Sequence, residues 1–400
     1  MHTGRKICFL AYTLKQIGYM RDFRDALPPG FSATVVIVAL LKWCSYFFSS
    51  RLPDGVSADE ITILITPHLQ KKLIHSPALD TPQWHNNMFR WACRWYRCYH
   101  WYLQRCDVLV IWGGFAMPLA VAALVAEKLG RKVIYIESGV LPGTIALDLQ
   151  GVNYNCSLRN VGADFYRSHP YNKEELSALQ TTLFPQRSLR KKVSSGDSDA
   201  EELPSRFALF AMQVHDDTQI RCFSPRFSSM FDAVKYVYSE LKKYNQQYND
   251  NLLLVVKEHP SDYGRIDYGE LFRQYPHIVF LRTTPIRDLI RKANLLITIN
   301  SSVAVEAMLT DLPVITLGDA FFNIPGLCSP LKPGEELSAL IPRAMNAGVD
   351  MELRNHFTCY LYHHYLLLWP KAGEDSMKMF CHRIAELVAC PSIPSCYQAK

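Results

Sequence analysis

The chain has 400 residues, of which 49% are hydrophobic and 20% are charged. This composition excludes disorder along the whole chain, and the length predicts two or three domains of about 100–200 residues each. The 43 Lys and Arg against 37 Asp and Glu leave a net charge of +6, which is too small to indicate nucleic-acid binding by itself. Such a surplus suits anionic small substrates or an anionic membrane surface.

Twelve cysteines are scattered along the chain without a CxxC pair or a Cys/His spacing typical of zinc sites. Scattered thiols favour a reducing compartment over a disulfide framework. The apolar run 7–12 is too short for a signal peptide, and Lys42 interrupts the longer apolar stretch 31–48. We therefore expect a cytoplasmic protein, with a buried strand followed by a helix at 31–48.

The first half of the chain alternates between strands and helices. Strands are predicted at 7–12, 33–38, 60–66, 107–112 and 132–137, and a helix at 117–129 ends before Gly130. Continuous apolar strands that alternate with helices indicate a parallel sheet covered on both faces.

The segment 188–205 is basic at its start and then rich in Ser and Asp, which is typical of a linker. After it the alternation restarts, with a helix at 230–244 and strands at 207–212, 252–257, 277–281, 295–299 and 314–317. We predict an α/β fold of two Rossmann-like domains that face a cleft. The predicted parts are an N-terminal domain (1–187), the linker, a C-terminal domain (206–345) and a helical tail (346–400) that could pack back on the first domain.

Polar residues follow four of the predicted strands. They are Glu137; Gln213, Asp216 and Asp217; Lys257, Glu258 and His259; and Asn300, Ser301 and Ser302. An α/β protein builds its ligand site at the carboxyl ends of its strands, so this recurrence is more informative than any single motif.

The run from Asn300 to Ser302 precedes a predicted helix at 303–309. Its hydroxyls could bind phosphate without a metal, or a serine could simply cap the helix. A protonated His259, together with Lys257, could neutralise a phosphate, and Pro260 makes a rigid turn there plausible.

The carboxylates of Glu137 and Asp217 could share nucleophilic and acid/base work across the cleft. Asp217 could equally be a turn or helix cap. Gly139, which follows Glu137, permits close backbone approach. The pair Asp216-Asp217 is not a metal-binding Asp-x-Asp, and we expect no metal cofactor.

Several motifs occur in one order between about 107 and 330. They are Glu137-Ser138-Gly139, Gly151-Val152-Asn153, Gln213-Val214-His215-Asp216-Asp217, Lys257-Glu258-His259-Pro260, Asn300-Ser301-Ser302 and the stretch from Gly318 to Leu327. On these motifs the chain resembles the capsule polysaccharide β-Kdo transferase family (Kdo is 3-deoxy-D-manno-oct-2-ulosonic acid). The family often has Glu-Glu-Gly where this chain has Glu137-Ser138-Gly139, and Asn-Ser-Thr where it has Ser302, which keeps the hydroxyl.

The resemblance implies a GT-B fold, CMP-β-Kdo as donor and retention of the β configuration. It implies that Asp217 is the nucleophile and that Glu137 is the acid/base or orients the acceptor hydroxyl. The residues implied to bind the donor are Gln213, Lys257, His259, Pro260, Asn300, Ser301 and Ser302.

The segment 84–105 interleaves aromatic and basic residues at helical spacing. Trp91, Arg94 and Trp95 would then face a lipid acceptor or a membrane surface. The alternative is a helix packed on the sheet with solvated arginines, and single-stranded nucleic acid is disfavoured by the other motifs.

The sequence thus predicts a cytoplasmic transferase, peripheral to the inner membrane, that moves Kdo from CMP-Kdo to a lipid or glycolipid acceptor alongside the capsule assembly machinery. A transferase for another CMP-linked acid sugar, such as sialic acid, is one alternative. A non-catalytic capsule-export or scaffold protein of the same fold is another.

Overall fold

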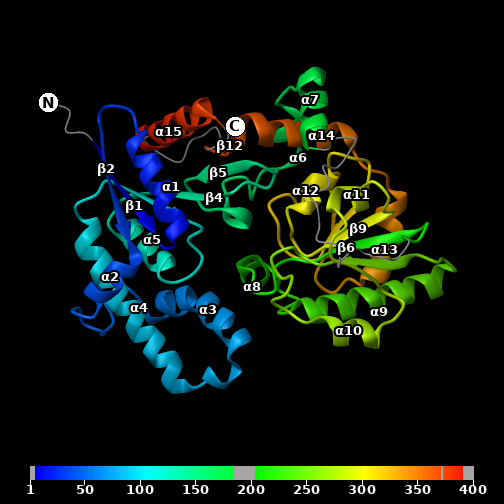
Figure 1. Ribbon diagram of the computed structural model, residues 1–400, viewed down its shortest axis with the longest axis horizontal. Coiled ribbons are helices and arrows are strands. Elements are labelled where there is room, and N and C mark those ends of the chain that lie inside the picture. The colour runs from blue at the N-terminus through cyan, green and yellow to red at the C-terminus, as the bar shows by residue number, and fades with distance from the viewer. Residues whose placement is uncertain (1–4, 184–202, 371–372, 391–400) are drawn as a thin grey trace. The chain divides into compact units, whose positions relative to one another are not determined.

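The computed structural model describes residues 5–183, 203–370 and 373–390 (Figure 1). These residues form two compact units. Unit 1 takes its residues from 1–139, 143–158 and 365–400, and unit 2 takes them from 140–142 and 159–364. The chain therefore changes unit near 158 and 364, whereas the sequence placed domain boundaries at 187 and 345. Of the predicted linker 188–205, all but 203–205 lies outside the described residues.

Unit 1 contains a six-stranded sheet in the order β12-β5-β4-β3-β1-β2. Strands β2, β1, β3 and β4 are parallel, with β2 at the edge, while β5 and β12 continue the sheet in antiparallel fashion. In chain order the parallel part runs 2-1-3-4, which is the start of a flavodoxin-like doubly wound order. The strands are β1 (Arg5–Ala11), β2 (Phe31–Ile37), β3 (Val108–Trp112), β4 (Lys132–Ser138), β5 (Thr144–Asp148) and β12 (Leu366–Leu368).

Helices cover both faces of the sheet at β1 and β3, which is why these two strands are apolar over most of their length. Cys8 and Leu10 of β1 pack against α2, α3, α4 and α5, whereas Ile7 and Phe9 pack against α1 and α15. In Figure 1, α1 and α15 lie side by side, and the ring centroids of Phe23 and Phe380 are 4.1 Å apart. The helices are α1 (Leu14–Asp25), α2 (Val38–Ser45), α3 (Ala58–His75), α4 (Pro82–Leu103), α5 (Leu119–Lys128) and α15 (Glu374–Ala389), with short 3-10 turns at Pro77–Leu79 and Asn153–Asn155.

The predicted strand at 60–66 is wrong, because these residues belong to helix α3. Their β-branched side chains favoured a strand, but a capping box starts the helix just before them. The Ser57 side chain accepts from the Glu60 backbone N–H at 3.1 Å, and Glu60 accepts from the Ser57 backbone N–H at 2.8 Å. Ile61, Ile65 and Leu69 then recur every four residues on the buried side. The other four strands predicted in this half, and the helix at 117–129, are confirmed, but β2 is a partly exposed edge strand and not the buried strand expected within 31–48.

Unit 2 contains a second six-stranded sheet, in the order β11-β10-β9-β6-β7-β8, and all of its neighbouring strands are parallel. In chain order this is the 3-2-1-4-5-6 arrangement of the Rossmann fold, and it reverses between β6 and β9. The strands are β6 (Phe207–Ala211), β7 (Leu253–Lys257), β8 (Val279–Leu281), β9 (Leu295–Thr298), β10 (Val314–Thr316) and β11 (Ser329–Pro330). All five strands predicted for this half are confirmed.

Helices α9 and α13 pack on one face of the second sheet and share a core with alternate residues of its strands. The helix predicted at 230–244 is α9, which ends at Asn249 in a left-handed conformation. The helices of unit 2 are α6 (Ala163–Arg167), α7 (Lys173–Leu183), α8 (Thr218–Phe223), α9 (Met230–Tyr248), α10 (Gly269–Gln274), α11 (Ile286–Ile290), α12 (Val303–Ala307), α13 (Leu337–Asn346) and α14 (Met351–Tyr360), and a π-helical turn follows at Leu361–Tyr365.

The C-terminal segment is divided between the two units. Helix α14 belongs to unit 2, whereas β12 pairs with β5 and α15 covers one face of the sheet in unit 1. Among the helices that the structure describes, none has the length and apolar character needed to cross a membrane.

Candidate functional site

The reversal point of the unit 2 sheet is occupied by two amide side chains. Gln213 follows β6 and Asn300 follows β9, and these two strands are neighbours. Gln213 Nε2 donates to Asn300 Oδ1 at 2.9 Å, and the Asn300 backbone N–H donates to Gln213 Oε1 at 3.1 Å. Both residues are buried. This reciprocal pair locks the two strand ends together at the place where doubly wound sheets bind ligands.

Asn300 also organises the loops around the strand ends. Its Nδ2 donates to the carbonyls of Gln219, Phe223 and Asp319 at 3.2–3.3 Å. Both ends of its amide are therefore engaged with the protein. The sequence implied that Gln213 and Asn300 bind the donor, and the structure instead gives their side chains a positioning role.

Lys257 ends β7 and is also directed into the protein. Its Nζ donates to the backbone carbonyls of Glu258 at 2.6 Å and Arg282 at 2.8 Å, and the residue is buried. The carboxylate of Glu258 accepts from Arg282 Nε at 2.9 Å. This geometry does not support the expected contact of Lys257 with a substrate anion, because its ammonium group joins the ends of β7 and β8.

His259 is the half-buried imidazole of this region. Its Nδ1 accepts from the Ser261 backbone N–H at 3.1 Å, which places the ring proton on Nε2 in the neutral state. Burial lowers the pKa of His259 below its usual value, although the nearby carboxylates of Asp262 and Asp217 act in the opposite direction. The lowered pKa favours a neutral imidazole that donates from Nε2 over the protonated His that the sequence suggested.

Pro260 lies in the turn that presents this imidazole. The Asp262 backbone N–H donates to the His259 carbonyl at 2.9 Å and closes the turn around the exposed proline. The rigid turn expected at Pro260 is present.

Asp217 follows β6 and begins helix α8. Its Oδ1 accepts from the Gln219 backbone N–H at 2.9 Å, so the residue is a helix N-cap. It is also a half-buried carboxylate close enough to His259 to influence the pKa of that ring. A cap and a nucleophile are compatible roles for Asp217, since the cap uses one of its two oxygens.

A buried carboxylate that the sequence did not single out holds this arrangement in place. Asp262 Oδ2 accepts from the His215 backbone N–H at 2.7 Å and so joins the loop after β7 to the loop after β6. Arg265 bridges the same loops, with contacts to Asp216 at 3.3 Å and Asp262 at 3.5 Å. The partners are 47 to 49 positions apart, and no local pattern signals such a contact.

The two serines after Asn300 differ in their contacts. Ser301 Oγ accepts from the Val303 backbone N–H at 3.3 Å, whereas Ser302 stands at the N-cap of α12 without a side-chain capping bond. The side chain of Ser302 is exposed. Helix α12 has only five residues, so its dipole is small. The hydroxyl groups of the two serines are therefore the main hydrogen-bond donors of this turn.

Glu137 lies in unit 1, near the end of β4. Its Oε1 accepts from Trp112 Nε1 at 3.1 Å and from the Ser138 backbone N–H at 2.9 Å. Gly113 and Gly114, which follow β3 beside it, have positive φ angles of 71° and 92°. A Cβ on Gly139 would collide with the side chain of Thr144, so the close approach expected there is confirmed.

Two aromatic residues beside Glu137 were not identified from the sequence. Trp112 and Trp369 have ring centroids 5.9 Å apart, and Tyr19 lies 6.3 Å from the first and 5.3 Å from the second. Trp369 comes from the C-terminal segment, so chain order gave no sign that it would reach β3. The half-exposed indole of Trp112 holds the carboxylate in place.

Helix α4 matches the predicted helix at 84–105, but its three singled-out residues have different surroundings. Trp95 is 1% exposed and stacks on Tyr99 within the core, so the expected membrane or acceptor contact is wrong for this residue. Trp91 and Arg94 are half-buried and line a pocket between α4 and α2. The alternative of a helix packed on the sheet is therefore right for one face of α4.

Among the residues that the structure describes, no group of three or more His, Cys, Asp or Glu is placed to hold a metal ion. Glu137 belongs to unit 1, while Asp217 and His259 belong to unit 2. The cooperation of the two carboxylates stays a prediction.

Comparisons with known proteins show which family part of the chain is similar to. A family model described as "Capsule polysaccharide biosynthesis protein" matches residues 163–360. The protein FixF of Sinorhizobium fredii is 28% identical over 262 residues, which are 65% of this chain and 60% of FixF. The capsule polysaccharide export protein KpsS of Escherichia coli is 29% identical over 32% of this chain and 33% of KpsS. Residues 163–360 of the chain are thus similar to the capsule polysaccharide biosynthesis family.

The matched residues lie within unit 2, which carries Asp217, His259 and the Asn300 turn. The chain spans less than two thirds of the length of the curated relatives it matches. A solved structure of Thermosulfurimonas dismutans KpsC, titled a beta Kdo 2,7 transferase, is similar with a TM-score of 0.50 and 14% identity, over 96% of this chain and 99% of that one. This likeness confirms the fold class, which is GT-B with two Rossmann-like units.

Proposed function

We propose that the protein is a retaining β-Kdo glycosyltransferase that moves Kdo from CMP-β-Kdo to a lipid or glycolipid acceptor in capsule-linker synthesis. The match of residues 163–360 to the capsule biosynthesis family model and the GT-B fold support this proposal, as do the motifs that resemble β-Kdo transferases. One observation carries it: Asp217 and His259 follow the carboxyl ends of the neighbouring parallel strands β6 and β7, and the buried Asp262 joins the two loops that carry them.

In the first proposed step, an Asp217 oxygen attacks the anomeric carbon of Kdo. The bond from that carbon to the CMP phosphate oxygen breaks, and CMP leaves with the electron pair. Kdo is then held as an ester on Asp217 with inverted configuration. His259 would donate its Nε2–H to the phosphate, and Ser301 and Ser302 would supply hydroxyl donors, because the charge on the leaving group is what needs stabilising.

In the second step, an acceptor hydroxyl attacks the same carbon and releases the Asp217 carboxylate. Glu137 would accept the proton of that hydroxyl. Two inversions at one carbon give net retention. The hydrogen bond from Trp112 orients Glu137, so the base has a defined direction in unit 1.

We also propose that transfer proceeds without a metal ion. The leaving group is already an anion, and hydrogen-bond donors fixed around a developing charge can supply much of the rate acceleration of an enzyme. Turnover should therefore be unchanged when the protein is dialysed against EDTA and assayed in chelator. Activity that disappears there and returns with Mg²⁺ or Mn²⁺ would contradict this part of the proposal.

The substitution Asp217→Asn tests the nucleophile. Asparagine caps helices as well as aspartate does, so α8 should keep its start, while a neutral amide cannot form the ester. We expect transfer, measured as CMP release and Kdo incorporation, to fall on the order of 10⁴-fold, with CMP binding preserved in calorimetry. Asp217→Ala, which also loses the cap, should show the same catalytic loss plus about 1 kcal/mol of destabilisation. Near-normal turnover of Asp217→Asn would remove Asp217 from the mechanism.

The same assay separates the alternatives. Competition between CMP-Kdo and CMP-sialic acid identifies the donor sugar, and preference for the second would replace Kdo in the proposal. A single-turnover incubation without CMP release or acceptor modification would instead favour a non-catalytic capsule-export or scaffold protein.

A further inference from the structure

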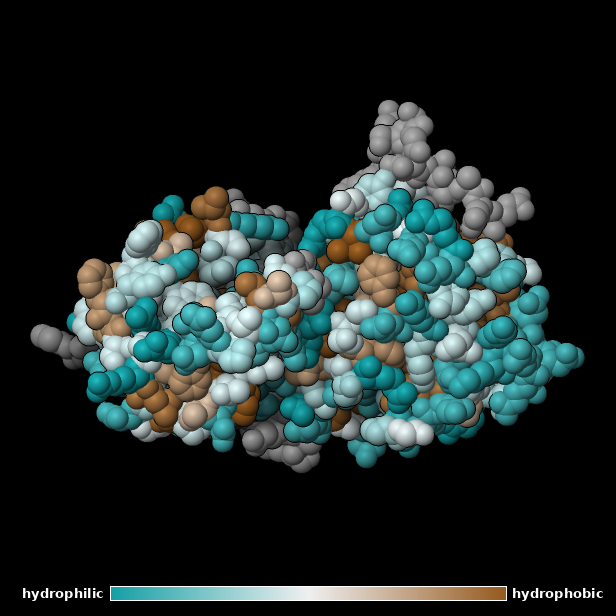
Figure 2. Space-filling view, turned by 90° about the horizontal axis from the view of Figure 1, so that it is seen from below, coloured by the Kyte–Doolittle hydropathy of each residue, from teal (hydrophilic) through white to brown (hydrophobic). Residues whose placement is uncertain are grey.

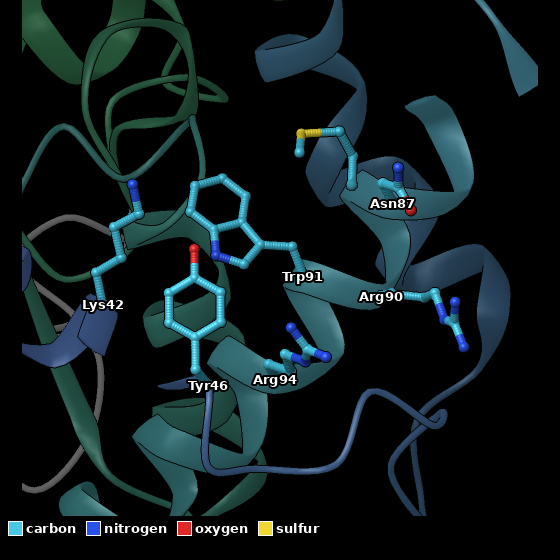
Figure 3. Close-up of a pocket in the computed structure, with 7 residues that line it drawn as sticks. Lys42, Tyr46, Asn87, Arg90, Trp91 and Arg94 are labelled. Carbon is cyan, nitrogen blue, oxygen red and sulfur yellow. The ribbon is translucent and has the colours of Figure 1, made fainter. Parts of the chain in front are cut away.

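A pocket of about 430 Å³ lies in unit 1 between α2 and α4. Figure 3 shows its lining. The lining residues are Lys42, Tyr46, Asn87, Met88, Arg90, Trp91 and Arg94. Three of these seven residues are cationic and none is a carboxylate. Since like charges in one pocket repel, this lining favours an anion.

Aromatic rings hold two of the three cations in place. Lys42 Nζ lies 6.0 Å from the ring centroid of Trp91, and the Arg94 guanidinium carbon lies 5.8 Å from that of Tyr46. Lys42, Tyr46 and Trp91 point toward one another in Figure 3, with Arg94 next to Tyr46, whereas Arg90 extends the other way. Fixing a cation over an aromatic face lowers the ordering cost when an anion binds.

Beside this pocket, helix α2 and the turn after it expose large apolar side chains. Val38, Leu41 and Ser45 form the buried face of α2. The exposed apolar residues are Leu40 at 64%, Trp43 at 73%, Tyr46 at 51% and Phe47 at 91%. In Figure 2, brown side chains interrupt the polar surface of unit 1. Packing within the described chain does not account for so much exposed aromatic area on an eight-residue helix and the turn that follows it.

We propose that this surface, which we call the α2 surface (Leu40, Lys42, Trp43, Tyr46, Phe47, Arg94), docks on a bilayer that contains anionic phospholipid. The phosphate of one headgroup would occupy the pocket between Lys42 and Arg94. Trp43 and Phe47 would enter the interface, where amphipathic and aromatic side chains are favoured.

Charge complementarity selects this occupant. A soluble phosphate would use the cations but would leave the exposed aromatic residues unexplained, and an apolar protein partner would leave Lys42 and Arg94 without counter-ions. An anionic bilayer satisfies both features at once. The inference does not depend on the transferase proposal, because docking requires no chemistry.

Flotation of the full-length protein with vesicles tests the proposal. We expect binding to vesicles of phosphatidylglycerol and phosphatidylcholine, and little binding to phosphatidylcholine alone. Lys42→Ala should weaken binding to the anionic vesicles about fivefold. Phe47→Ser should weaken it about tenfold, and both side chains are exposed, so the fold should be retained. Asp217→Asn should float like the wild type, which separates this test from the test of transfer.

Matched substitutions elsewhere control for general effects. Leu14→Ser removes an apolar side chain that is 88% exposed on α1, and Lys378→Ala removes an exposed cation on α15. Both should float like the wild type. Equal binding to neutral and anionic vesicles would overturn the proposal, as would unchanged binding of both Lys42→Ala and Phe47→Ser. Calorimetric binding of inorganic phosphate without any vesicle binding would replace the membrane by a soluble anion.

Discussion

The strand ends of unit 2 and the α2 surface of unit 1 both gather polar and aromatic residues, but they use them differently. In unit 2 several of the polar groups hydrogen-bond to one another, as Gln213 and Asn300 do. These bonds hold the loops that carry Asp217 and His259. On the α2 surface, cations and aromatic rings remain exposed. The comparison teaches that a polar residue at a strand end can serve as scaffold, with its side chain engaged in buried hydrogen bonds as in Gln213 and Asn300.

The largest expected effect separates the two faces of α4. Trp95→Ala removes a fully buried indole and should lower the free energy of unfolding by about 3–5 kcal/mol. Trp101→Ala, at a position that is 51% exposed on the same helix, should change it by no more than about 0.5 kcal/mol. Urea unfolding followed by circular dichroism measures both. Equal losses for the two variants would contradict the burial assigned to Trp95.

The next effect distinguishes scaffold from ligand contact at the reversal point of unit 2. Asn300→Ala leaves Gln213 and several loop carbonyls without their partner, so unfolding free energy should fall by about 3 kcal/mol. Ser302→Ala should leave stability within about 0.5 kcal/mol of wild type, because its exposed hydroxyl makes no capping bond. Weaker CMP binding by a stably folded Ser302→Ala variant would support a ligand contact for Ser302, in contrast to the scaffold role of Asn300. If Asn300→Ala were as stable as wild type, the scaffold role would be refuted.

The smallest effect concerns His259. His259→Gln should raise the Kd for CMP about tenfold, the loss of one hydrogen bond to a charged group, as measured by calorimetry near pH 7.5. An unchanged Kd would count against the phosphate contact.

The pH dependence of stability follows from the same residue. The folded state holds the pKa of His259 below its unfolded value near 6.5, so its contribution to stability is fully present above that pH. It declines as the pH falls through 6.5 toward the folded pKa, because the unfolded state binds the proton first. The stability of wild type relative to His259→Gln should therefore decrease between pH 7 and pH 5. If the relative stability instead rose as the pH fell from 7 to 5, the lowered pKa of His259 in the folded state would be contradicted.

Local patterns predicted much of the fold. Apolar runs such as 107–112 and 295–299 mark strands that are covered on both faces, and helices between them require parallel pairing. The strand predicted at 60–66 was wrong because the β-branched composition favoured a strand while the capping box favoured a helix. Only the burial of Ile61 and Ile65 on one face of α3 decided between the two.

The candidate site was predictable in outline but not in its roles. Strand ends located Glu137, Asp217 and His259, because carboxyl ends of parallel strands meet at one edge of a sheet. The partners Asp262 and Trp369 were not predictable, since nothing local in the sequence signals a contact across tens or hundreds of residues.

By itself the sequence determined the two α/β halves, the family motifs and the positions where chemistry could gather, because these depend on periodicity and residue type along the chain. The tertiary structure alone decided which of those groups are engaged and which stay exposed. Gln213 and Asn300 are 87 positions apart, and only the pairing of β6 with β9 joins them. Likewise, Trp91 and Trp95 are four residues apart on one helix, yet packing buries one in the core and leaves the other to line a pocket.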